Sequence, residues 1–246
     1  MSHNISNTVS FVCQTYTILV SNYSHYFVKR CSLESWTLLP KQFQFYVVEC
    51  KLLSKGNFQR VRLIEAHNAI FNYDLISICE TSLNDSVELP ESLLKDYTFV
   101  HANNPANTRR GGVGFFYKNS LPVIVRNDLS FAESIVVELK FGRKKIFFTV
   151  LYRSPAFNHS SSEFQAFLTN FENLHSKIKT ENPFAMFFTG DFNAHSQFWW
   201  PDGDTTAEGT ELEELFTKLA LFQLISEPTN FEPHKNPSCI DLVVTD

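Results

Sequence analysis

The sequence predicts an α/β protein, a layered sandwich of sheets and helices. Apolar runs of strand type alternate in part with segments of helical period, and some strand candidates follow one another as hairpins. A purely parallel sheet would need a helix after every strand, so this mixture favours layered sheets. The 246 residues, 43% of them hydrophobic, are enough to bury a large core, and 25 phenylalanines will supply much of its area.

Residues 1–39 differ from the rest of the chain. They are rich in Ser, Asn, Thr, Tyr and Val, and they contain short β-like runs at 15–20 and 26–28 without a clear period. This composition predicts a weakly structured extension with a stray strand at most. Pro40 is the predicted boundary, and residues 40–246 form the predicted domain.

After Pro40 the pattern is that of regular secondary structure. Runs rich in β-branched and aromatic residues predict strands at 43–48, 74–79, 113–117, 134–139, 145–152, 184–189 and 239–245. Apolar residues at helical spacing predict helices at 58–72, 163–178 and 209–222. Acidic residues at the start of the last helix suit the positive end of its dipole.

Charge and composition exclude several classes of protein. The net charge of -5 gives the whole molecule no basic field for nucleic acid, so phosphate chemistry would need local cations or a metal. Five scattered cysteines without a CxxC pair indicate reduced thiols in an intracellular compartment and no zinc cage. The sequence offers neither a signal peptide nor an apolar run near the roughly 20 residues of a membrane helix, so no membrane partner is expected.

Polar side chains follow the apolar strand runs, which is where layered α/β proteins place ligands. Glu80 follows the run 74–79 and is either a Mg²⁺ ligand or a strand-end carboxylate in water. Asp191 and Asn193 follow the run 184–189 and alternate, so both side chains would face one way in an extended segment. Together they could align a water and hold a phosphate oxygen, or they could form an Asx turn.

Three further stretches contain candidate residues. Tyr152 and Arg153 end a strand and could donate to a phosphate, or they could be a rim tyrosine and a surface ion pair. Asp241, close to Ser238, lies inside an apolar run, where a carboxylate is costly unless a His or Arg pairs with it. Arg110 precedes two glycines and could clamp a polyanion or be solvated, and the stretch matches neither common phosphate-loop pattern.

Five stretches in this order resemble the endonuclease/exonuclease/phosphatase superfamily, and more closely the apurinic-type endonuclease domain of non-LTR (LINE-type) retrotransposons. They are DLISICET (74–81), RGGVGFFY (110–117), LYRSP (151–155), GDFNAH (190–195) and SCIDLV (238–243). The resemblance implies a four-layered α/β sandwich of the deoxyribonuclease-I type. It also implies hydrolysis of phosphodiester bonds in DNA by an activated water, with Mg²⁺ or Mn²⁺ as the cofactor.

The resemblance also implies a role for each catalytic residue. Glu80 would be the metal ligand, and Tyr152 would contact the phosphate through its hydroxyl. Asp191 would position or deprotonate the attacking water, and Asn193 would hold the phosphate. Asp241 would orient a histidine that contacts the scissile phosphate.

Arg110, Arg153 and Ser238 are the residues that we expect to bind the substrate. The sequence departs from the family pattern at two points. The family's first strand ends in an Asn of the metal site, and the stretch 47–51 has none. The family's histidine follows the strand 239–245, and this sequence ends at Asp246. We therefore expect the last strand to be missing and the chain as it stands to nick DNA weakly or not at all.

Other functions stay open at this point. One is a retroelement remnant without catalysis, and another is a phosphatase or phospholipase of the same superfamily. For the leading function we expect DNA as the substrate, a nuclear location, and a reverse transcriptase domain downstream in a full-length element.

Overall fold

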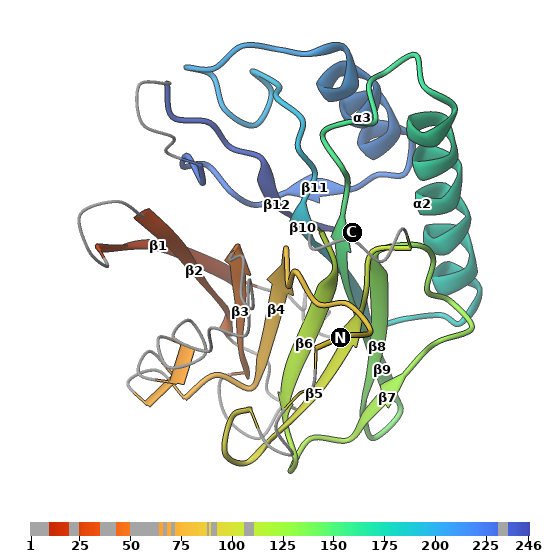
Figure 1. Cartoon of the computed structure of the whole chain (residues 1–246). Helices are drawn as coiled ribbons and strands as arrows, with labels where there is room; N and C mark the ends of the chain where they lie inside the picture. Colours follow the sequence, from red (N-terminus) through yellow and green to blue (C-terminus); the bar gives the residue numbers. More distant parts are fainter. Residues whose placement is uncertain are drawn as a thin grey trace, which may run out of the picture.

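In the computed structural model two sheets of six strands face each other, and helices cover the outer side of one of them (Figure 1). The structure describes residues 10–19, 25–34, 43–49, 64–65, 68–69, 72–87, 89, 93–105, 111–230 and 236–246, and only the backbone in the first three ranges. The prediction of an α/β sandwich is confirmed. No helix in the described part of the chain is long and apolar enough to cross a membrane.

The first sheet has the order β1–β2–β3–β4–β6–β5. Its strands are β1 (Ser10–Leu19), β2 (His25–Glu34), β3 (Phe43–Glu49), β4 (Leu75–Cys79), β5 (Tyr97–Ala102) and β6 (Val113–Lys118). Only the β3–β4 pair is parallel, and the others are antiparallel. The predicted helix at 58–72 lies mostly outside the described residues.

Part of the N-terminal segment differs from its prediction. β1 and β2 pair along ten residues each, and β2 also pairs with β3. Two strands therefore occur where weak structure was expected. β-branched and aromatic residues in both segments suit the extended backbone even without a clean alternation. The proposed domain boundary at Pro40 itself stays a prediction.

The second sheet has the order β11–β12–β10–β9–β8–β7. Its strands are β7 (Val123–Val125), β8 (Ser134–Phe141), β9 (Lys144–Tyr152), β10 (Ala185–Asp191), β11 (Phe222–Gln223) and β12 (Asp241–Thr245). β9 and β10 are parallel, because helix α2 (Ser162–Thr180) carries the chain back between them, as a parallel connection requires. β10 and β12 are antiparallel.

The core explains why β4 is apolar on both faces. Leu75 and Cys79 join the large cluster between the sheets, whereas Ile76 and Ile78 join a smaller cluster on the outer face. Alternate residues of a strand point to opposite faces, so a strand covered on both sides is buried at every position. Its one polar residue, Ser77, is also buried, and its hydroxyl accepts a hydrogen bond from Thr189 at 3.2 Å. This burial fixes the end of β4, where Glu80 follows, close to the second sheet.

Two helices cover the outer face of the second sheet (Figure 1). α2 begins at the N-cap Ser161, whose hydroxyl accepts the N–H of Phe164 at 3.1 Å. α3 (Ala207–Lys218) begins at the N-cap Thr206, which accepts the N–H of Gly209 at 3.2 Å. The predicted helix at 209–222 is therefore wrong at its C-terminal end, because Ala220 takes a φ of 53° and turns the chain into β11.

Candidate active site

Three predicted residues lie in one row across the second sheet. Asp191, the last residue of β10, is the register partner of Tyr152 in β9 and of Asp241 in β12. All three side chains are buried, with 7% or less of each residue exposed. Neighbouring strands lie about 5 Å apart, so this register brings the three side chains to the same end of the sheet.

Glu80 joins this row from the other sheet. It directly follows β4, is half-buried, and takes a φ of 54°, which is unusual for a residue with a side chain. The Tyr152 hydroxyl donates to Glu80 Oε1 at 3.3 Å. This contact joins the two sheets at the end of the sandwich where the predicted residues meet.

The sheets approach closely just beneath these side chains. The Cys79 thiol donates to the carbonyl of Leu151 and accepts the N–H of Asp191, both at 3.3 Å. A Cβ on Gly190 would lie 1.9 Å from the Leu151 carbonyl oxygen and 3.1 Å from Cys79 Sγ. Gly190 is therefore required by the close packing of the two sheets directly before Asp191.

Burial and like charges set the electrostatics of the row. Burial raises the pKa of Asp191 well above its usual value, and the carboxylates of Asp241 and Glu80 raise it further. Burial also raises the pKa of Tyr152, with further contributions from Glu80 and Asp191. The Tyr152 hydroxyl therefore keeps its proton at neutral pH, and the Asp191 carboxylate binds a proton more strongly than an ordinary aspartate.

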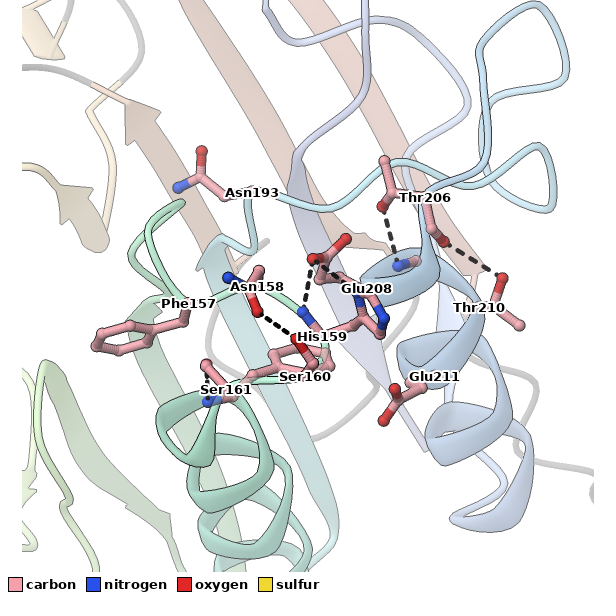
Figure 2. A network of polar contacts seen from close by, with 12 residues as sticks. Phe157, Asn158, His159, Ser160, Ser161, Asn193, Thr206, Glu208, Thr210 and Glu211 are labelled. Carbon is pink, nitrogen blue, oxygen red and sulfur yellow. Dashed lines mark hydrogen bonds and ion pairs between the residues drawn. The ribbon is translucent and has the colours of Figure 1, made fainter.

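Asn193 forms the Asx turn that was one of its two predicted roles. Its N–H donates to Asp191 Oδ1 at 2.8 Å, its side-chain amide donates to the Arg153 carbonyl at 2.8 Å, and its φ is 46°. The turn aligns the Asp191 carboxylate from one side. In Figure 2 the Asn193 side chain lies apart from the polar cluster formed by His159 and Glu208.

Arg153 has a different surrounding from the one we expected. Only 2% of it is exposed, and its guanidinium donates to the carbonyls of Phe192, Phe157 and Asn193 and stacks at 5.3 Å over the ring of Phe164. These contacts use the fork of the guanidinium to hold two loops together. The expected contact of Arg153 with a substrate phosphate is therefore not supported by its position.

The loop that follows β9 is also held to α3. The N–H of His159 donates to Glu208 Oε1 at 2.7 Å (Figure 2). Gln165 of α2 also donates to Glu211 at 2.9 Å. Glu208 lies in the first turn of α3, where the helix dipole stabilises a carboxylate. Hydrogen bonds from its own N–H and that of His159 lower the pKa of Glu208 despite its partial burial.

Of the other two expected substrate-binding residues, only Ser238 lies in the described part of the chain. Arg110 lies outside the described residues. Ser238 is half-buried, and its backbone pairs with Asn230 in an isolated bridge. The next residue, Cys239, accepts a hydrogen bond from the Trp199 indole at 3.0 Å, which ties the loop after Asn193 to the start of β12.

Sequence reasoning missed one acidic residue beside the row. Glu133 is 6% exposed, and its Oε1 accepts the N–H of Gly112 at 2.8 Å and the Asn104 amide at 3.3 Å. Burial raises its pKa, and the charge of Glu80 raises it further. The only sequence signal is a Glu placed directly before an apolar strand run, which is too common to single out.

The donor set fits a divalent cation held by few protein ligands. No group of three His, Cys, Asp or Glu side chains in the described part of the chain forms a cage for a metal. Mg²⁺ is usually bound through one or two carboxylates plus waters and substrate phosphates, so a cage is not required. Glu80 is half-exposed beside Tyr152, and Asp191 feels both its charge and that of Asp241, so a cation here would relieve the repulsion.

The C-terminal part of the chain matches the model of a known family. Residues 146–246 match the model of a family described as endonuclease-reverse transcriptase. The match includes Tyr152, Asp191, Asn193 and Asp241. A comparison with curated protein sequences finds no match.

Solved structures with similar folds are nucleases and related enzymes. The endonuclease domain of TRAS1, a telomere-specific non-LTR retrotransposon, superposes with a TM-score of 0.60 and 18% identity over 80% of this chain and 82% of that one. The AP endonuclease LMAP from Leishmania major gives 0.66 and 14% over 82% and 78%. A 3' phosphatase from Neisseria bound to a product DNA hairpin gives 0.53 and 15% over 75% and 81%.

Proposed function

Because the chain has the fold of the endonuclease/exonuclease/phosphatase superfamily and matches a retrotransposon-type endonuclease family over residues 146–246, we propose that it is a metal-dependent DNA endonuclease of retrotransposon origin. One observation carries this proposal. Glu80 from one sheet meets the row of Tyr152, Asp191 and Asp241 from the other, through the contact between Tyr152 and Glu80.

Asp191 is the proposed general base. Its raised pKa makes its carboxylate a stronger proton acceptor than an ordinary aspartate, which suits removal of a proton from an attacking water. The Asn193 N–H donates to one carboxylate oxygen of Asp191 at 2.8 Å, and the other oxygen would accept the proton of an attacking water. Asp241, the register partner, contributes the negative charge that strengthens this base.

Tyr152 is the proposed donor to the phosphate. Its hydroxyl stays protonated, so it can donate to a non-bridging oxygen on which charge develops. In the structure this hydroxyl donates to Glu80, and a substrate oxygen would take over part of that contact.

Glu80 is the proposed ligand of Mg²⁺ or Mn²⁺, with Asp191 and Asp241 nearby. The ion, when bound, would neutralise charge on the phosphate and on the leaving oxygen. The net charge of -5 gives the chain as a whole no attraction for DNA, so a bound cation is needed to offset the charge of the phosphate. Arg110 is the proposed cationic contact, and a downstream reverse transcriptase and a nuclear location complete the proposal.

Nicking of supercoiled plasmid tests the proposal. The protein is used in excess over plasmid with Mg²⁺, so that slow chemistry is detected, and EDTA should abolish the reaction. Asp191→Ala should slow nicking by roughly 100-fold or more, because a general base contributes about 10²- to 10⁴-fold. Glu80→Gln should raise the Mg²⁺ concentration that is required for nicking.

The matched control for these variants is Glu172→Gln. Glu172 is an acidic residue of α2 that pairs with Lys218 at 2.6 Å, away from the row, so the variant removes one charge without touching the site. Equal nicking by wild type and Asp191→Ala would contradict the proposal. Turnover of an inositol phosphate or sphingomyelin without nicking would identify the phosphatase or phospholipase alternative instead.

A further inference from the structure

Glu133 connects two parts of the candidate site without lining it. It directly precedes β8, is buried, and takes a φ of 53°, which side chains rarely adopt. Its Oε1 accepts two hydrogen bonds, from the Gly112 N–H at 2.8 Å and from the Asn104 amide at 3.3 Å. One carboxylate oxygen is therefore engaged both with the turn at residues 111–112 and with Asn104.

That turn holds the residues that follow Glu80. The carbonyl of Gly112 accepts the N–H of Thr81 at 3.1 Å, and the carbonyl of Gly111 accepts the N–H of Ser82 at 3.0 Å. Glu80 and Ser82 each have a φ of 54°, a strained conformation that persists only when surrounding contacts impose it. The hydrogen bonds to the Gly111 and Gly112 carbonyls are contacts of this kind. Glu133 holds the same turn through its bond to the Gly112 N–H.

Glu133 and the turn also contact Tyr152. The Glu133 carbonyl accepts the Tyr152 N–H at 3.0 Å. A Cβ on Gly111 would lie 2.1 Å from Glu133 Oε1 and 3.1 Å from Tyr152 Cε1, so the turn backbone packs directly against the tyrosine ring. One buried residue thus supports both partners of the contact between Tyr152 and Glu80.

We propose that Glu133 is a positioning residue, which through the turn at 111–112 presents Glu80 and Tyr152 to each other and so sets the affinity of the site for its divalent cation. This inference rests on the proposed function for the identity of the ligand. In this proposal Glu133 acts through its Oε1, which accepts hydrogen bonds from the Gly112 N–H and the Asn104 amide.

Four variants of the whole chain test this proposal. Glu133→Leu removes the acceptor at similar size, and Glu133→Asp keeps the charge but shortens its reach. Glu133→Gln keeps an acceptor oxygen at the same reach and should therefore retain the function of the wild type. Glu138→Gln is the matched control, because Glu138 is buried nearby in β8 but pairs with Arg126 at 2.7 Å outside the site.

Binding of Mn²⁺ alone, followed by electron paramagnetic resonance, gives a measurement independent of activity. Glu133→Leu and Glu133→Asp should weaken Mn²⁺ binding by about 10- to 100-fold, the usual effect of removing a residue that orients a metal ligand. In nicking assays kcat should fall while KM for plasmid stays within about twofold, since the support acts on the metal ligand and not on DNA binding. Glu133→Gln and Glu138→Gln should stay near wild type in both measurements.

Amide hydrogen exchange separates failure of this inference from failure of the proposed function. If the turn depends on Glu133, exchange at Thr81, Ser82 and Gly112 should become faster in Glu133→Leu and Glu133→Asp, whether or not the protein binds metal. Unchanged exchange and unchanged Mn²⁺ binding in either folded variant would overturn the inference. A wild-type protein that neither binds Mn²⁺ nor nicks would overturn the proposed function, and the exchange rates would then decide the role of Glu133 alone.

Discussion

Asp191 and Asp241 lie directly opposite each other in the antiparallel pair of β10 and β12. They are 3% and 5% exposed, and burial together with the charge of Asp241 raises the pKa of Asp191. Two buried carboxylates at neighbouring positions lower the stability of a fold, because each disfavours ionisation of the other. Their presence is better explained by the chemistry of a site than by the needs of the core.

Asp191→Asn should therefore stabilise the protein at neutral pH while it slows nicking as strongly as Asp191→Ala does. The folded-state pKa of Asp191 lies above its unfolded value, so the wild type loses stability as the pH rises above the ordinary aspartate value of about 4. The variant lacks this loss and should be more stable by about 1 kcal/mol at neutral pH and not at low pH. Urea unfolding across this range measures both.

The control for this prediction is Asp202→Asn, which removes one charge from an exposed loop residue. It should change the free energy of unfolding by less than about 0.5 kcal/mol at any pH. A Asp191→Asn variant that is less stable than wild type at neutral pH would show that the carboxylate pair is favourable, for example through a bound cation.

Gly190→Ala should disrupt the approach of the two sheets. The new Cβ would lie 1.9 Å from the Leu151 carbonyl oxygen, and a φ of 142° is itself strained for alanine. We expect a loss of about 3 kcal/mol or more, because backbone would have to move. Thermal and urea unfolding measure the loss.

Gly142→Ala is the matched control for that variant. Gly142 also has a positive φ, 62°, but a Cβ there would meet nothing within 4 Å. Its cost should be only the conformational one, about 1 kcal/mol. Equal losses for the two variants would show that the close contact beneath Asp191 is absent in solution.

Much of the fold could be predicted from the sequence because its central strands are apolar on both faces. β4, β6, β9 and β10 are runs of mostly apolar residues, and each was predicted within a few residues. The edge strands β5 and β7 were missed, because most of their residues are at least partly exposed and they carry no such run.

The site could be predicted only where a polar residue interrupts or ends an apolar run. Glu80, Tyr152, Asp191 and Asp241 satisfy this condition, and the structure brings them to one end of the sandwich. Glu133 does not stand out, because its role depends on a contact with Gly112, 21 residues away, through positive-φ turns that leave no periodic pattern.

Arg153 is a residue that the sequence singled out for a role that its position does not support. An arginine at a strand end looks the same in the sequence whether it meets a phosphate or backbone carbonyls. The structure gives it carbonyl partners, so Arg153→Lys should cost about 2 kcal/mol of stability, since an ammonium cannot reproduce the planar fork. The salt dependence of DNA binding, measured in EDTA to prevent cleavage, should be unchanged.

Arg110→Gln provides the comparison for Arg153→Lys. Arg110 is still the proposed phosphate contact, and loss of one such contact lowers the slope of log K against log salt by about 1. A lower slope for Arg153→Lys, with stability intact, would restore Arg153 as a substrate-binding residue.

An ion-pair network far from the site should contribute to acid unfolding. Glu181, which follows α2, accepts from Arg126 at 2.5 Å and from Lys145 at 2.8 Å, and these cations lower the pKa of Glu181 to about 2. A lowered folded-state pKa contributes stability above the unfolded value of about 4.5 and loses it as the pH falls toward about 2. The network joins the end of α2 to the second sheet, so its loss should loosen the helix that covers the core.

Glu181→Gln should therefore cost on the order of 1 kcal/mol at neutral pH, and its difference from wild type should shrink as the pH falls from about 5 to about 3. Urea unfolding at several pH values gives this difference directly. Asp128→Asn is the control, because Asp128 also pairs with Arg126 but its side chain is 62% exposed, so water replaces the lost contact and the cost should be smaller. A Glu181→Gln deficit that is equally large at low and neutral pH would show that the residue acts through packing, because the lost charge could not then be its cause.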